Sequence, residues 1–418
     1  MNWGDFRTLF KGVGWKRLTP HEVDASVSNG HEFQGVSALR TLLGTETIER
    51  LPTTYMLLRD EQDDIETIHS WSSWYDSRRN QPHRSAEWRL YYPAEAGQIQ
   101  AQMHAGDLMV LAPTREGPLF ILMAEEGSSR EQQLLQLFRI EESGQPQLSA
   151  MPFDESLAID FVSASVLEEL GLADELEPVG SDSTIVSLLV RELVDEYPES
   201  LPPGAAVAAL VRSRLVGIDP IDDPDNALIR WIEAEAAVYR EWEDQKIARR
   251  LAKGFATADG APDVEGFRKF SMSLRQSRVS RAGGALQFHF RTLLDEHGIR
   301  YVMEPVIDGG EIPDFLFPGV AEYQDQNYPA HGLRMLAAKF TAKDRWRQVL
   351  NEAERINPKH LLTLETGITR RQMSLMTRAQ LVLVLPKAVQ NKYPPAQRDG
   401  IISVTTFIEE VANLLLIS

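Results

Sequence analysis

Two residues that lie far apart in the chain have the types and the setting of a metal-assisted hydrolytic site. Asp314 directly precedes the apolar run 315–317, and Lys339 ends a second apolar run, 335–338. Both runs are predicted to be short buried strands. A hard divalent cation takes carboxylate oxygens and usually keeps waters, and a lysine beside it can orient the attacking water or a phosphate oxygen. Asp314 and Lys339 fit these two roles.

The residues after Lys339 change from a strand pattern to a helix pattern. A helix is expected to begin near Lys343, with an apolar stripe formed by Trp346, Val349, Leu350 and Ala353. Its other face carries Arg345, Gln348 and Glu352 at i, i+3 and i+7. Arg is the usual bidentate partner of guanine and Asp accepts from cytosine, so Lys343, Asp344 and Arg345 are expected to read G·C pairs in a major groove. Glu352 is expected to reach back and share the metal with Asp314.

Three segments together resemble a known family. PDFLFP, AAKFTAKDRWRQVLNEAE and the upstream SRAGGALQFHF are similar to the catalytic domain of the EcoRII-type restriction endonucleases, a branch of the PD-(D/E)xK nucleases. The resemblance extends from about Asp219 through LVLVLPKAVQNKYP, roughly the last 200 residues. A lone PD and xK pair would be a weak signal. The carboxylate 13 residues after the lysine, with KDRWRQ between them, makes the combination specific.

The resemblance implies a restriction-endonuclease-like α/β core with a mixed central sheet and a helical cap. It implies a type II site-specific deoxyribonuclease that uses Mg²⁺, held by Asp314 and Glu352, to hydrolyse double-stranded DNA. The implied target is a short sequence bounded by CC and GG pairs, with Arg347 as a further DNA contact. Such an enzyme belongs to a restriction-modification system for phage defence and is paired in function with a DNA methyltransferase.

Two further residues of the catalytic site come from the resemblance. Family members carry a glutamate aimed at the metal on the helix expected at 285–296, and this chain has Gln287 in its place. A neutral amide cannot supply a carboxylate's charge, so metal affinity or rate is expected to be lower. Tyr323, nine residues after Asp314, matches a family tyrosine near the catalytic centre, and a core tyrosine is an equal alternative.

Composition limits the compartment and the chemistry. The 418 residues are enough for two or three domains with sizeable cores. The chain has no run of 18 apolar residues and no signal-peptide pattern at its N-terminus, so we expect a cytoplasmic protein without membrane association. It has no cysteine, which excludes disulfides and cysteine-ligated metals. No nucleotide-binding loop or nucleophile elbow is present.

The net charge of −18 is unevenly distributed. Residues 151–250 hold 8 Lys and Arg against 22 Asp and Glu, whereas residues 331–400 hold 13 against 5. The local field matters more to a nucleic acid than the sum does. The acidic stretch is either a solvated helical surface or a DNA mimic that controls access to the basic part.

Residues 1 to about 150 are predicted to be mainly β, because short apolar or alternating runs are separated by turn residues. We expect a β-pseudobarrel with a helix near 36–43. The region weakly resembles the B3-like DNA-binding domain of the same endonuclease type, whose two motifs correspond to residues 75–78 and 87–90 here. Expected DNA contacts are Arg78, Arg79, Arg84, Arg89, Trp74 and Trp88. The alternative is an exposed loop whose aromatic residues anchor it to the barrel.

The expected domains are a DNA-recognition domain at 1–165, an acidic linker at 166–180 and the catalytic domain at 181–418. Helices are expected from about Thr184, over 204–215 and over 224–251, and two more between Gly266 and His297. Arg278 and Arg281 would form a basic edge ahead of Gly283 and Gly284, which are predicted to be either a turn near DNA or a helix-start loop. An apolar helix is expected over 405–416.

A homodimer is expected on functional grounds, because palindromic DNA favours a two-fold symmetric protein. Two other function classes stay open. One is a DNA-binding protein in which Gln287 marks a catalytically weakened or inactive site, and the other is an acidic scaffold without DNA binding.

Overall fold

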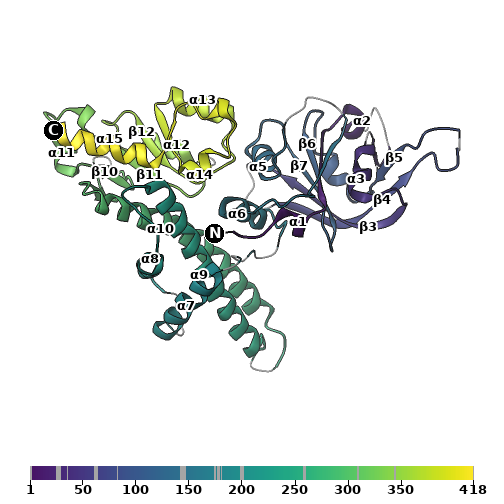
Figure 1. Cartoon of the computed structure of the whole chain (residues 1–418), viewed down its shortest axis with the longest axis horizontal. Coiled ribbons are helices and arrows are strands. Elements are labelled where there is room, and N and C mark those ends of the chain that lie inside the picture. The colour runs from purple at the N-terminus through teal and green to yellow at the C-terminus, as the bar shows by residue number, and fades with distance from the viewer. Residues whose placement is uncertain are drawn as a thin grey trace. The chain divides into compact units, whose positions relative to one another are not determined.

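The computed structural model describes the chain except residues 1, 25–29, 35, 61–64, 82, 142–146, 174–175, 177–178, 180, 198–201, 258–259, 308–309, 343–344 and 418. Within helices, the side chains of residues 181–183, 275–280, 282 and 415–417 are also outside the description. The chain divides into two compact units, whose bodies are residues 2–176 in one and residues 177–365 and 370–418 in the other (Figure 1).

The N-terminal unit is built on one eight-stranded sheet with the order β2-β5-β4-β3-β7-β6-β1-β8. Neighbouring strands are antiparallel except β3 and β7, which are parallel. The strands are β1 (Gly12–Arg17), β2 (Glu32–Phe33), β3 (Ile48–Leu58), β4 (Glu66–Asp76), β5 (Trp88–Tyr91), β6 (Leu108–Pro113), β7 (Leu119–Ala124) and β8 (Ser149–Pro152). One cluster of buried side chains includes Phe33 of the edge strand β2 and Leu148, directly before the opposite edge strand β8. Because both edges contribute to one core, the sheet is curled, which confirms the expected β-pseudobarrel.

Short helices cover the sheet of the N-terminal unit. They are α1 (Phe6–Leu9), α2 (Pro20–Val23), η1 (Ser37–Leu39), α3 (Arg40–Leu43), α4 (Gly97–Gln100), α5 (Ser129–Leu137) and α6 (Phe161–Glu169). The helix expected near 36–43 is therefore present, as η1 and α3. The first residues of the segment expected to be a linker, 166–169, are the last turn of α6, and Val166 and Leu167 are buried in it.

The C-terminal unit contains a six-stranded mixed sheet with the order β14-β13-β12-β11-β10-β9. The strands are β9 (Val302–Met303), β10 (Phe315–Phe317), β11 (Arg334–Ala338), β12 (Lys359–Leu362), β13 (Leu381–Val384) and β14 (Ile401–Ile402). β9, β10 and β11 pair antiparallel, and β11 to β14 pair parallel. The two apolar runs beside Asp314 and Lys339 are therefore strands, as the sequence predicted, and they are neighbours inside the sheet.

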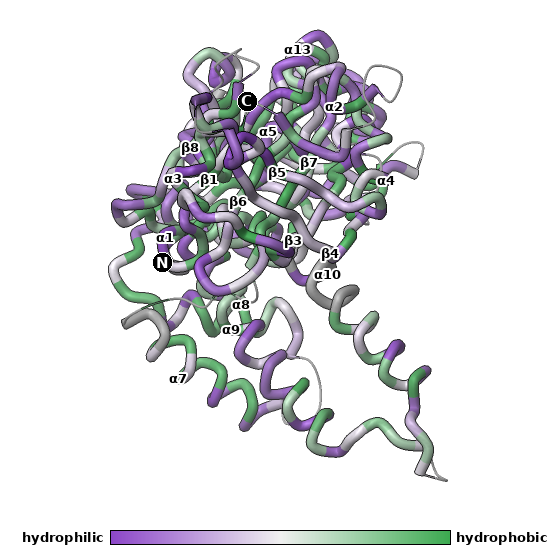
Figure 2. Tube along the Cα trace, turned by 90° about the vertical axis from the view of Figure 1, so that its right-hand side faces the viewer, coloured by the Kyte–Doolittle hydropathy of each residue, from purple (hydrophilic) through white to green (hydrophobic). Residues whose placement is uncertain are grey.

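Four helices precede the strands of this unit along the chain: α7 (Ser181–Glu196), α8 (Gly204–Arg214), α9 (Pro224–Lys253) and α10 (Val264–Glu296). Along α7, green hydrophobic stretches alternate with purple ones, as expected for an amphipathic helix (Figure 2). The remaining helices are α11 (Val320–Gln324), η2 (Ala330–Gly332), α12 (Trp346–Val349), α13 (Arg370–Arg378), α14 (Lys387–Gln390), η4 (Pro395–Gln397) and α15 (Val404–Ile417). No helix in the described part of the chain is both long and apolar enough to cross a bilayer.

The prediction of two helices between Gly266 and His297 is wrong, because α10 is one continuous helix of 33 residues. Gly283 and Gly284 lie inside α10 and form neither a turn nor a loop. Each glycine costs about 1 kcal/mol relative to alanine in a helix interior. Packing of α10 against α8 and α9 outweighs this cost.

The long helix expected from Lys343 is also wrong. Among the described residues of this segment, the only α-helix is α12, a single turn. The chain then bends at Glu352 and takes a left-handed φ of 50° at Ala353. In a continued helix the Ala353 N–H would donate to the Val349 carbonyl. It donates instead to the Glu311 carboxylate, at 2.8 Å. A side chain from another segment thus ends the helix before Glu352.

Asp225, in the first turn of α9, ties three helices together. Its Oδ1 accepts from the backbone N–H of Lys387 and Val404, at 3.1 and 3.0 Å. Its Oδ2 accepts from the N–H and hydroxyl of Thr405, at 3.2 and 2.6 Å. The carboxylate is buried and meets the N-terminal ends of α14 and α15, where unpaired N–H groups favour an anion.

Asp225→Asn is expected to lower the free energy of unfolding by about 3 kcal/mol, because an NH₂ group of the same size would face N–H donors. Chemical denaturation of the full chain, followed by circular dichroism, measures the change. Asp222→Asn, at an exposed position in the turn before α9, is the matched control. Equal stability of the two variants would contradict the role of Asp225.

Candidate active site

Antiparallel pairing of β10 with β11 brings Asp314 and Lys339 together. Phe315 lies opposite Leu336, so the residue before β10 lies near the end of β11, where Lys339 follows. The Lys339 Nζ donates to Asp314 Oδ2 at 2.8 Å, and the Ala338 N–H donates to the same oxygen at 2.7 Å. Asp314 is buried, whereas a quarter of the Lys339 side chain is exposed (25%). The ammonium group is therefore held by the carboxylate while it remains accessible from outside.

Gln287 occupies the other oxygen of the same carboxylate. Its Nε2 donates to Asp314 Oδ1 at 2.9 Å, which places this part of α10 beside the ends of β10 and β11. Gln287 is thus a hydrogen-bond partner of Asp314. Its amide orients Asp314 and adds no negative charge.

Glu352 approaches this pair from the bend after α12. Desolvation by burial raises the pKa of Glu352 to about 7; the negative charges of Asp314 and Glu311 add to the rise, and Lys339 and Lys359 oppose it. Its Oε2 is buried and has no hydrogen-bond partner. A buried carboxylate oxygen without a donor is unfavourable unless a proton or a cation reaches it.

These features fit a divalent cation. Asp314 and Glu352 are the carboxylates that could hold it. The Glu352 Oε2, which has no hydrogen-bond partner, could be one of its ligands. Within the described residues, no group of three or more His, Asp or Glu side chains is arranged so that it could hold a metal ion. One or two carboxylates, with waters and substrate phosphate, are the usual ligands of Mg²⁺.

Two charged residues around Glu352 were missed by sequence reasoning. Glu311 lies three residues before Asp314 and accepts from Ala353 N–H, and Lys359 is the buried first residue of β12. The Lys359 Nζ lies within 3.5 Å of the Ala353 and Ile356 carbonyl oxygens. The one signal available was the position of Lys359 directly before the strand-like run HLLTL.

The residues expected to read the target are only partly described. Lys343 and Asp344 lie outside the described residues. Arg345 and Arg347 are exposed, and the Arg347 guanidinium lies 5.0 Å from the centre of the Trp346 ring. Because the helix ends early, Arg345 and Glu352 do not share a helix face as expected.

Tyr323, Arg281 and Arg278 are three further predicted site residues. Tyr323 is buried in α11, and the Arg355 guanidinium lies 5.7 Å from its ring centre. Arg281 is nearly buried (10% exposed) and lies 3.3 Å from Glu243 on α9, which makes it part of the α9–α10 packing and leaves little of it for DNA. The side chain of Arg278 lies outside the described residues.

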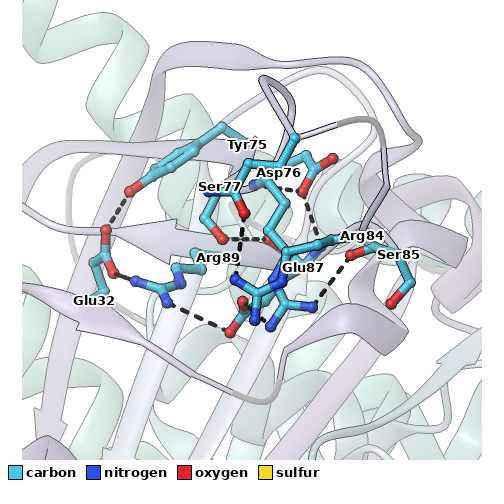
Figure 3. A network of polar contacts seen from close by, with 10 residues as sticks. Glu32, Tyr75, Asp76, Ser77, Arg84, Ser85, Glu87 and Arg89 are labelled. Atoms are coloured by element: carbon cyan, nitrogen blue, oxygen red, sulfur yellow. Dashed lines mark hydrogen bonds and ion pairs between the residues drawn. The ribbon is translucent and has the colours of Figure 1, made fainter.

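In the N-terminal unit, two of the predicted arginines belong to a carboxylate network (Figure 3). Glu87 lies 2.7 Å from Arg78 and 3.4 Å from Arg89, and Arg89 lies 2.6 Å from Glu32. Glu32 also accepts a hydrogen bond from Tyr75. Asp76 Oδ1 accepts from the N–H groups of Arg78 and Glu87, which fixes the turn between β4 and β5.

Trp74 and Trp88 cannot serve as the expected base contacts. They are 0% and 6% exposed, stack on each other with ring centres 4.8 Å apart, and belong to the core of the pseudobarrel. Both point inward on alternate positions of β4 and β5. The alternative interpretation, in which aromatic residues anchor this segment to the barrel, is the correct one for these two. Arg79 and Arg84 remain exposed.

The pH dependence of the free energy of unfolding should report the ionisation of the Glu352 carboxyl group. Its folded-state pKa lies above the ordinary 4.5, so the folded protein binds the extra proton between pH 4.5 and about 7. The stability that this proton contributes is complete below the lower value and is lost as the pH rises to the higher one. In metal-free protein, Glu352→Gln should therefore stabilise more, relative to the parent, at pH 8 than at pH 5.

Urea unfolding in EDTA at the two pH values measures this difference. Glu354→Gln, which removes an exposed carboxylate of the same bend, is the control. A Glu352→Gln effect that is the same at both pH values would show that the carboxyl group does not titrate as its burial predicts.

Comparisons with known proteins match the C-terminal half of the chain. Residues 239–408 match the family model described as EcoRII C terminal. The chain is 37% identical over 193 residues to the type II restriction enzyme EcoRII of Escherichia coli. This match covers 46% of the present chain and 46% of that enzyme, so the chain spans about half the length of this curated relative.

Two solved structures of restriction-enzyme DNA complexes are also similar. Metal-depleted Ecl18kI in complex with uncleaved, modified DNA is 20% identical, with a TM-score of 0.43 and coverage of 56% of this chain and 84% of that one. The PspGI–substrate DNA complex is 19% identical, with a TM-score of 0.39 and coverage of 57% and 95%. The sequence matches thus show that residues 239–408 are similar to the EcoRII C-terminal family.

Proposed function

We propose that the protein is a type II restriction endonuclease, which uses Mg²⁺ to hydrolyse phosphodiesters at a specific site in double-stranded DNA. The observation that carries the proposal is that Lys339 and Glu352 both interact with Asp314, where β10 begins and β11 ends. The match of residues 239–408 to the EcoRII C-terminal family model supports it.

Each residue of the site has a separate proposed role, which follows from its charge and position. Asp314 and Glu352 would hold the cation, which when bound supplies Lewis-acid polarisation of the scissile phosphate and offsets charge that develops on it. Lys339, held by Asp314 at 2.8 Å, would donate hydrogen bonds that orient the attacking water in line with the leaving 3′ oxygen. Gln287 keeps the Asp314 carboxylate oriented through its other oxygen.

Target recognition is proposed for the segment between Lys339 and Glu352. Exposed Arg345 would pair with guanine in the major groove, together with Lys343, Asp344 and Arg347, at a site bounded by CC and GG pairs. This segment connects Lys339 to Glu352 in the chain, so the residues proposed to recognise the bases would be covalently close to the proposed catalytic residues.

The N-terminal unit is proposed to bind further DNA as a B3-like recognition domain. Its exposed Arg79 and Arg84 are suited to phosphate contacts, and Arg78 and Arg89 would lie beside them on β5 and the turn between β4 and β5. We propose a boundary between a recognition domain and a catalytic domain after α6. A homodimer matched to a near-palindromic site and a protective DNA methyltransferase complete the proposed system.

A second candidate function is specific DNA binding without cleavage. It is favoured by Gln287, because the site has two carboxylates where a third is expected from the resemblance. The two functions differ in one result. A binding protein would shift DNA in a gel with every divalent metal and would cut it with none.

Purified protein incubated with genomic DNA and Mg²⁺ is expected to produce discrete fragments. Lys339→Ala should reduce the cleavage rate at least about 100-fold, because the water loses a positioned donor. Fragment yield over time on an agarose gel measures the rate.

The matched control is Lys253→Ala, at the exposed end of α9. Cleavage by Lys339→Ala at the parent rate would refute the assignment of Lys339. Tight DNA binding with no fragments from the parent protein would support the second candidate function.

Arg345→Ala is expected to relax the sequence preference, at a cost of about 1 to 3 kcal/mol for each lost base contact. Cleavage of a plasmid carrying one target and of single-base variants of that target measures the ratio of rates. Arg347→Ala tests the neighbouring exposed arginine in the same assay. An unchanged ratio for Arg345→Ala would refute its role as a reader.

A further inference from the structure

Glu352 has no helix to hold it in place. It lies at a bend between the single turn of α12 and Ala353, whose left-handed φ of 50° is unfavourable for a residue with a Cβ. Its own N–H donates to the Val349 carbonyl at 3.2 Å. A backbone in this conformation persists only where surrounding groups fix it.

One of the fixing groups comes from the segment that carries Asp314. The Glu311 Oε2 accepts from the N–H of Ala353, the residue next to Glu352, at 2.8 Å. Glu311 and Asp314 are separated by only two residues. The hydrogen bond therefore joins the backbone beside one carboxylate of the site to the chain segment that carries the other.

Lys359 holds the same bend from β12. Its Nζ lies 3.5 Å from the Ala353 carbonyl oxygen and 3.3 Å from that of Ile356, inside a buried environment. The N–H and the carbonyl of Ala353 are thus both held by side chains, one acidic and one basic. Lys359 also places a positive charge near Glu311.

We infer that Glu311 is a positioning residue, which holds the Glu352 carboxylate at its distance from Asp314 through the Ala353 N–H. The inference rests on the proposed function, in which these two carboxylates share a cation. Glu311 itself is not proposed as a ligand. It acts through backbone geometry, so the inference depends on its hydrogen-bonding reach.

Two substitutions separate reach from charge. Glu311→Gln keeps the length and an acceptor oxygen but removes the charge. Glu311→Asp keeps the charge but withdraws the carboxylate by one methylene from the Ala353 N–H. Glu354→Gln and Glu354→Asp are the matched controls, because Glu354 is an exposed glutamate of the same bend.

The first readout is Mn²⁺ binding to the full chain without DNA, measured from the electron paramagnetic resonance signal of the free ion. Mn²⁺ takes the same oxygen ligands as Mg²⁺. Glu311→Asp is expected to weaken Mn²⁺ binding about tenfold, as the loss of an outer-shell partner does, while Glu311→Gln stays within about twofold of the parent. Both Glu354 variants should bind as the parent does.

The second readout needs no metal. Hydrogen exchange of the Ala353 amide should accelerate in Glu311→Asp and remain slow in Glu311→Gln. Weaker Mn²⁺ binding in Glu311→Gln than in Glu311→Asp would overturn the inference, and so would parent-like Mn²⁺ binding in Glu311→Asp. A parent protein that binds no Mn²⁺ and cuts no DNA would overturn the proposed function as well, which distinguishes the two failures.

Discussion

The buried carboxylate of Asp314 is the constraint on which the candidate site depends. Removing a charge from water is costly, and the charge is tolerated only where donors replace the lost hydration. Here the donors come from three separate places: the backbone at the end of β11, the Lys339 side chain and the Gln287 amide on α10. The need to satisfy one anion therefore fixes a strand end, a lysine and a long helix relative to one another.

Much of the C-terminal sheet could be predicted because its signals are local. The apolar runs on either side of the catalytic residues are short and bounded by turn residues, and each became a central strand. The positions of Asp314 and Lys339 follow from that pairing alone. The helices α7, α8, α9 and α15 were also predicted within a few residues, since each has an apolar stripe of helical period.

The parts that could not be predicted are decided by groups distant in sequence. The stripe at 346–353 is helical in period, but Glu311 takes the N–H that a longer helix would need. Two glycines suggested a break in α10, but packing against neighbouring helices kept it whole. Trp74 and Trp88 were placed among exposed arginines because their neighbours in sequence are charged, whereas the alternation of β4 and β5 turns both inward.

The acidity of the chain is consistent with a local basic surface, because many of its carboxylates are used internally. In the N-terminal unit, Glu87 and Glu32 neutralise two of the arginines on β5 and the adjoining turn. In the C-terminal unit, Asp225 meets helix N-termini and Glu243 meets Arg281. Net charge alone is therefore a poor guide to the field that a ligand would meet.

The two halves of the mixed sheet differ in how they can form during folding. β10 and β11 are antiparallel neighbours joined by residues 318–333, so the pairing of these two strands is enough to bring Asp314 and Lys339 together. Glu352 lies within the crossover from β11 to the parallel strand β12, and its bend is held by Lys359 at the start of β12. The candidate cation site would thus be completed only when the parallel half of the sheet has assembled, so that partly folded chains would carry a lysine–aspartate pair without the second carboxylate.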